Sequence, residues 1–64
     1  MTISSREIFK LLKADGWYIA RVRGDHYQFK HPVKKGTVTV QHPKKDLDID
    51  IIKSIEKQSG VKLI

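Results

Sequence analysis

The fold is decided by residues 17–41, which read WYIARVRGDHYQFKHPVKKGTVTVQ. Three runs in this segment are rich in aromatic and β-branched residues, as strands are, and glycine-containing turns separate them. We expect the strands to cover residues 17–22, 26–31 and 37–41. Gly24-Asp25 and Lys34-Lys35-Gly36 can each turn the chain back on itself. The segment therefore predicts a three-stranded antiparallel meander.

A helical pattern precedes the strands. Ser4 lies three residues before Glu7, which is the spacing of a capping box, and apolar residues then recur at helical intervals. We expect a helix from Ser5 to Ala14, with Gly16 at the turn that ends it.

A second helical pattern follows the strands. Asp46 or Asp48 can cap a helix whose first turn is acidic, and Gly60 can end it. Its expected apolar stripe consists of Ile51, Ile52 and Ile55.

The order helix, strand, strand, strand, helix predicts an α+β fold. Both helices are expected on one face of the sheet, which leaves the other face open to solvent. A chain of 64 residues has room for one core. We therefore expect a single domain over residues 1–64.

Composition excludes several classes of protein. The chain has no cysteine, which rules out disulfides, a thiolate zinc site and a thiol nucleophile. The three histidines do not form a metal-binding pattern, so we expect no metal and no cofactor. No apolar run approaches the roughly 20 residues of a membrane helix, and the N-terminus does not resemble a secretory signal. We expect a cytoplasmic protein without membrane contact.

The positive charge is concentrated in one part of the chain. Residues 21–45 carry seven cationic side chains against Asp25 alone, which accounts for the whole net charge of +6, whereas the flanking segments balance. Such a distribution is typical of a surface that binds a polyanion.

Strand alternation predicts which side chains face solvent. If Val38 and Val40 point at the helices, and Tyr27 and Phe29 do the same, the residues between them point outward. The first strand is ambiguous, because both of its alternating sets contain apolar members, and we favour the set with the arginines outward. The expected open face consists of Arg21, Arg23, His26, Gln28, Lys30, Thr39 and Gln41, with Lys34 and Lys35 at one edge.

These residue types suit RNA. Arginine can bind phosphate with two hydrogen bonds, lysine acts as a point charge, and Gln28 can reach sugar or phosphate oxygens. His26 is the one member of the open face that can exchange a proton near neutral pH. Cleavage of RNA needs the ribose 2′-hydroxyl to be deprotonated, the phosphate to be stabilised and the leaving oxygen to be protonated. DNA lacks that hydroxyl and should be spared.

Each assignment has an ordinary alternative. His26 could be a turn histidine without chemistry, and a charged hairpin could simply keep the protein soluble. His31 and His42 fall in the apolar phase of their strands and precede prolines, so we interpret them as packing residues. The open face could also bind RNA without cutting it, or dock an acidic protein.

The segment Gly24-Asp25-His26-Tyr27-Gln28-Phe29 resembles the glycine-serine-histidine motif, with its following strand, of the HicA family of bacterial toxins. The helix end at 13–17, the two histidine-proline pairs at 31–32 and 42–43, and the closing helix at 52–60 occur in matching order. The resemblance covers nearly the whole chain, and its specificity lies in the order and spacing of these features taken together.

This resemblance implies a fold similar to the double-stranded RNA-binding domain and a ribonuclease that cleaves messenger RNA without a cofactor. It implies that His26 is the catalytic residue and that a HicB-like antitoxin covers it in a hetero-oligomer. The sequence departs from the motif at Asp25, where serine is usual. A carboxylate there could orient the histidine ring and favour its charged form, or could repel RNA phosphate.

Overall fold

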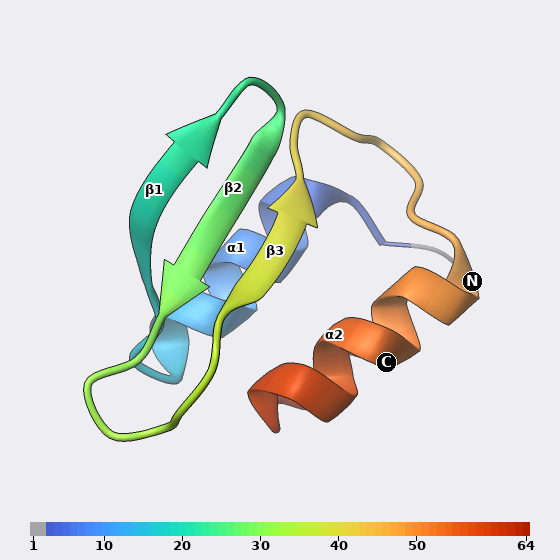
Figure 1. Cartoon of the computed structure of the whole chain (residues 1–64). Coiled ribbons are helices and arrows are strands. Elements are labelled where there is room, and N and C mark those ends of the chain that lie inside the picture. Colours follow the sequence, from blue (N-terminus) through green and yellow to red (C-terminus); the bar gives the residue numbers. More distant parts are fainter. Residues whose placement is uncertain (1–2) are drawn as a thin grey trace.

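The computed structural model describes residues 3–64 and contains the five expected elements in the expected order (Figure 1). They are α1 (Ser5–Ala14), β1 (Tyr18–Arg23), β2 (His26–Lys30), β3 (Val38–Gln41) and α2 (Ile49–Ser59). The strands form one antiparallel sheet in the order β1-β2-β3. The predicted α+β fold is therefore confirmed.

Four strand boundaries differ from the prediction by one residue, because β1 begins at Tyr18 and ends at Arg23, β2 ends at Lys30 and β3 begins at Val38. Trp17 lies before β1 because its backbone N–H bonds back to the carbonyl of Leu12 at the end of α1, at 3.0 Å. His31 lies after β2 because its ring bonds the backbone of the loop that follows. In both cases a local hydrogen bond turns the chain out of the sheet.

The predicted limits of α1 are confirmed. The hydroxyl of Ser4 accepts a hydrogen bond from the backbone N–H of Glu7 at 3.3 Å, which satisfies one of the free donors of the first turn. At the other end, the N–H groups of Asp15 and Gly16 bond the carbonyls of Leu12 and Lys13. Gly16 takes the positive φ, 106°, that ends the helix.

The predicted stripe of α2 is wrong at one residue. Ile52 and Ile55 are buried, but Ile51 is 41% exposed. Adjacent helical residues point about 100° apart, so Ile51 cannot share the inward face that Ile52 and Ile55 define. Ser59 occupies that face instead and its hydroxyl donates to the carbonyl of Ile55 at 2.7 Å. Asp48 precedes the helix without a side-chain capping bond, and Gly60 ends it.

One hydrophobic core joins both helices to the same face of the sheet. Its buried members are Ile3, Ile8, Leu12, Trp17, Phe29, Val38, Val40, Leu47, Ile52, Ile55 and Leu63. In Figure 1, α1 lies behind the sheet and α2 runs beside β3. The opposite face of the sheet carries none of these buried residues, as predicted. Within residues 3–64, neither helix has the length and apolar composition that a membrane span requires.

A β-bulge resolves the ambiguity of the first strand. Ile19 pairs with Phe29, whereas Arg21 pairs with Gln28, so Ala20 is an extra residue between them. The extra residue shifts the alternation by one. Ile19 therefore packs against the core while Arg21, two residues later, is aligned with the outward Gln28.

We predict that Gly16→Ala destabilises the fold more than Gly36→Ala does. Both glycines have positive φ, 106° and 92°, which costs about 1–2 kcal/mol for alanine. A Cβ on Gly16 would also lie 2.8 Å from Nε2 of His31, whereas one on Gly36 would meet nothing within 4 Å. Urea denaturation of the two variants measures the difference, and equal free energies of unfolding would contradict the contact with His31.

Candidate functional site

Strand register brings most of the predicted site residues together on the open face. Arg23, His26 and Gln41 lie side by side across the three strands, and we call them the histidine row. Arg21, Gln28 and Thr39 form the adjacent row. Lys30 lies further along β2, opposite Tyr18. All are exposed except Gln28, which is half-buried.

The turn at Gly24-Asp25 places a carboxylate beside the histidine row. Gly24 has a φ of 62°, and the carbonyl of Asp25 accepts a hydrogen bond from the N–H of His42 at 2.8 Å. Oδ1 of Asp25 lies 3.5 Å from Nε2 of His26, and Oδ2 accepts a hydrogen bond from Nε2 of Gln41 at 2.8 Å. The bond from Gln41 lowers the pKa of Asp25, with smaller contributions from His26 and Lys44. Asp25 is therefore an anion at neutral pH.

The site can exchange protons and hold an anion. The side chain of His26 is 60% exposed, so a ligand can reach its ring. Arg23 is its neighbour in the histidine row and Arg21 lies in the adjacent row. A proton-exchanging ring beside arginines suits chemistry at a phosphate.

His31 is a packing residue, as predicted. Its Nδ1 accepts hydrogen bonds from the N–H groups of Val33 and Lys34, both at 3.0 Å. Because Nδ1 accepts, the proton of the neutral ring is on Nε2, which lies 2.8 Å from the carbonyl oxygen of Asp15. The ring also packs edge-on against Trp17. Both ring nitrogens are occupied, which leaves none for chemistry.

His42 is likewise a packing residue. Its Nδ1 lies 2.7 Å from the hydroxyl of Ser5. Its ring packs tilted against Phe9 and edge-on against Tyr27, with centroids 4.5 and 5.1 Å apart. It ties the end of the sheet to the start of α1. Of the three histidines, His26 alone lies on the open face.

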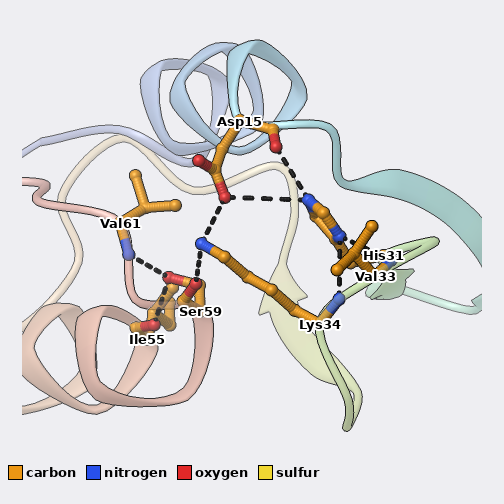
Figure 2. A network of polar contacts seen from close by, with 7 residues as sticks. All are labelled: Asp15, His31, Val33, Lys34, Ile55, Ser59 and Val61. Atoms are coloured by element: carbon orange, nitrogen blue, oxygen red, sulfur yellow. Dashed lines mark hydrogen bonds and ion pairs between the residues drawn. The ribbon is translucent and has the colours of Figure 1, made fainter.

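Lys34 does not join the open face. Its Nζ lies 2.6 Å from Oδ2 of Asp15 and 3.0 Å from the carbonyl oxygen of Ser59 (Figure 2). The loop after β2 thus sends this lysine toward the C-terminal ends of both helices, where carbonyl groups and the helix dipole favour a cation. We call Asp15, His31, Lys34 and Ser59 the lysine clamp. Lys35 is exposed and takes no part in the clamp.

A second cationic region adjoins the Gly24-Asp25 turn. A cavity of about 320 Å³ is lined by Ser4, Ser5, Arg6, His42, Pro43, Lys44 and Lys45. The bond from His42 to Asp25 and the effect of Lys44 on the pKa of Asp25 place this region next to the histidine row. Positive charge therefore continues past the turn toward the start of α1.

Two features of the site were missed from sequence. The bond between Gln41 and Asp25 could have been found, because a hairpin register that pairs Gln41 with His26 brings Gln41 to the turn. The capture of Lys34 by the clamp had no sequence signal, since Lys34 and Lys35 are adjacent and identical.

Among residues 3–64, no three metal-ligating side chains gather in a group that could hold an ion.

Comparisons with known proteins give a consistent result. A family model described as the HicA toxin of bacterial toxin-antitoxin systems matches residues 5–61. A solved chain from a HicA3 and HicB3 toxin-antitoxin complex superposes with a TM-score of 0.78 at 26% sequence identity. That match covers 97% of this chain and 100% of the other. No curated protein sequence matches at a significant level.

We predict that Lys34→Met lowers the melting temperature while Lys35→Met leaves it unchanged. Methionine keeps an apolar stem but removes the cation that joins Asp15 to Ser59. Both variants lose one positive charge, so the comparison isolates the clamp. The two melting temperatures are measured by thermal unfolding monitored with circular dichroism. Equal melting temperatures would contradict a structural role for Lys34.

The pH dependence of the melting temperature provides a second test with the same two variants. The hydrogen bond from Lys34 lowers the pKa of Asp15. A carboxyl whose pKa is lower in the folded chain stabilises the fold above its unfolded pKa, about 3.9 for aspartate, and this contribution is lost as the pH falls through the folded pKa. Between neutral pH and roughly pH 3, the melting temperature should therefore fall further for Lys35→Met than for Lys34→Met.

Proposed function

The chain belongs to the HicA family of bacterial toxins, and from this membership we propose that it is an endoribonuclease that cleaves messenger RNA with His26. As a HicA toxin it is one half of a toxin-antitoxin system. The finer proposal concerns its chemistry. The observation that carries it is the histidine row, in which an exposed imidazole lies beside an arginine on a cationic sheet face.

The proposed reaction needs three things from the protein. His26 exchanges the proton of the ribose 2′-hydroxyl or of the leaving oxygen. Arg21 and Arg23 bind the phosphate, whose negative charge grows in the transition state. Gln28, Lys30 and Lys35 hold neighbouring sugar and phosphate groups. This chemistry requires neither a metal ion nor a cofactor.

Lys34 is left out of the proposed RNA contacts. Its Nζ is already bound to Asp15 and Ser59 on the helix side of the sheet. An RNA strand on the open face would have to break the lysine clamp to reach it.

A second candidate function is RNA binding without cleavage. The same sheet face offers phosphate contacts whether or not His26 reacts, and double-stranded RNA-binding domains hold RNA largely by shape and backbone contacts. The two candidates differ in the fate of the RNA, which the first experiment below measures.

We also propose a HicB-like antitoxin as the protein partner, acting in the cytoplasm, where messenger RNA is translated. The support is the solved HicA3 and HicB3 complex, in which the matched chain aligns with 97% of the present chain. In the proposed hetero-oligomer the antitoxin covers His26. The product of a small gene beside this one should then copurify with the chain and suppress its toxicity.

We predict that His26→Ala strongly slows RNA cleavage while the chain still folds and binds RNA. General acid-base catalysis by one side chain contributes about 10²–10⁴-fold, so the loss should lie in that range. The measurement is cleavage of an RNA and of the DNA of the same sequence by the purified chain, with the RNA cut and the DNA intact. Induction of the wild-type chain should arrest bacterial growth, whereas induction of His26→Ala should not.

Thr39→Ala serves as the control, since Thr39 also lies on the open face but cannot exchange a proton near neutral pH. It should cleave at nearly the wild-type rate. A wild-type chain that binds RNA and leaves it intact would favour the binding module. Unchanged cleavage by His26→Ala would remove His26 from the mechanism.

We predict that Arg21→Glu and Arg23→Glu weaken RNA binding and that Lys10→Glu, on the exposed side of α1, does not. All three substitutions change the net charge equally, so only the position of the charge differs. Each lost phosphate contact should reduce the slope of log affinity against log salt by about 0.7. Binding is measured in the His26→Ala background to keep the RNA intact, and equal losses for all three variants would contradict a localised RNA surface.

A further inference from the structure

We propose that Asp25, held in place by Gln41, is a positioning residue that keeps a proton on Nε2 of His26 and leaves Nδ1 as the atom that meets the RNA. The inference rests on the proposed ribonuclease function and assigns a role to each nitrogen of its histidine. Asp25 itself need not touch the substrate.

The carboxylate of Asp25 is anchored twice to the end of β3. Its Oδ2 accepts a hydrogen bond from Nε2 of Gln41 at 2.8 Å, and its backbone carbonyl accepts one from the N–H of His42 at 2.8 Å. Gln41 is also the register partner of His26. The strand that lies beside His26 therefore also fixes the group that faces its ring.

The remaining oxygen of Asp25 faces one particular ring nitrogen. Oδ1 lies 3.5 Å from Nε2 of His26. An anion at this distance favours a proton on the nearer nitrogen, because the N–H dipole and the imidazolium charge are both attracted to it. Within residues 3–64, Nδ1 makes no hydrogen bond or ion pair. The free lone pair of the neutral ring is therefore the one on Nδ1.

Two cationic residues lie near the Asp25-His26 pair. Arg23 lies beside His26 in the histidine row, and Lys44 acts on Asp25 from beyond the turn. Cations disfavour a positively charged ring. The carboxylate of Asp25, 3.5 Å from Nε2, is the anion that attracts the imidazolium formed in the proposed reaction.

These roles define a balanced reaction. Nδ1 removes the proton from the 2′-hydroxyl as the 2′-oxygen forms a bond to phosphorus, and the bond from phosphorus to the 5′-oxygen breaks. A water molecule protonates the departing 5′-oxygen, and the resulting hydroxide is neutralised by the proton that the imidazolium releases. The products are a 2′,3′-cyclic phosphate and a 5′-hydroxyl end. Asp25 stabilises the imidazolium between these steps, as the acidic member of a catalytic triad does.

Asp25→Asn tests the proposal, because the amide oxygen can still accept the bond from Gln41 while the charge is removed. We expect kcat to fall roughly 5- to 50-fold, less than on removal of the histidine itself, with KM for RNA unchanged. Gln41→Ala should act in the same direction. The double variant should be no slower than Asp25→Asn, because both changes remove one interaction. Asp25→Ala provides a second loss of the carboxylate, should the asparagine variant fold poorly.

Asp48→Asn is the matched control, since it makes the same change in net charge at the start of α2 and removes no side-chain capping bond. It should leave kcat unchanged. A lower melting temperature without a change in kcat for Asp25→Asn would assign Asp25 to the turn alone and overturn the proposal. A rise in kcat or in RNA affinity would overturn it too, since Asp25 would then act by repelling phosphate.

A readout without catalysis separates this inference from the proposed function. The ¹⁵N shifts of the neutral His26 ring report which nitrogen carries the proton. The wild-type chain should hold it on Nε2 to a greater extent than Asp25→Asn does, and equal proton distributions would overturn the positioning role. Absence of RNA cleavage by the wild-type chain would instead remove the ribonuclease function and leave this measurement valid.

Discussion

The single apolar face of the sheet is the constraint on which the rest of the structure depends. Phe29, on the central strand β2, is fully buried, and Val38 and Val40 on the neighbouring β3 are buried too. Once these side chains face the helices, the pleat sends His26 and Gln28 to solvent. The site is thus a consequence of the core. The face that the core leaves uncovered is therefore available for a ligand.

This constraint explains how far the sequence could predict the site. Alternation along β2 and β3 is unbroken, so the orientation of His26 and Gln28 followed from Phe29 and Val38. Alternation along β1 is broken by the bulge at Ala20, and Ile19 and Arg21 belong to one set in sequence yet face opposite sides of the sheet. A bulge depends on pairing with the neighbouring strand, which a local pattern does not contain. The arginines were placed correctly because burying them without partners would be costly.

The lysines of this chain have different structural surroundings, which its composition does not show. A domain of this size without disulfides has a small core, and polar contacts join its outer segments. The lysine clamp joins the loop after β2 to both helices. Glu56 in turn accepts hydrogen bonds from the N–H groups of Leu63 and Ile64, at 2.7 and 3.1 Å, which lower its pKa and hold the last residues against α2. Lys34 therefore stabilises the fold, although in the sequence it carries the same charge as its neighbour Lys35.

The chain holds two histidine-aspartate pairs, one that packs within the fold and one to which we assign the proposed reaction. His31 lies 3.9 Å from the carboxylate of Asp15 and its side chain is 10% exposed. Its Nδ1 accepts two backbone hydrogen bonds, so proton exchange there would break the loop it supports. His26 lies 3.5 Å from the carboxylate of Asp25, is 60% exposed, and has no such bonds to lose. A carboxylate beside a histidine is therefore insufficient to mark a reactive site. The pair to which we assign the proposed reaction is the one whose second ring nitrogen makes no hydrogen bond within residues 3–64. The turn at Gly24-Asp25 places this His26 at the start of β2, on the face of the sheet opposite the helices.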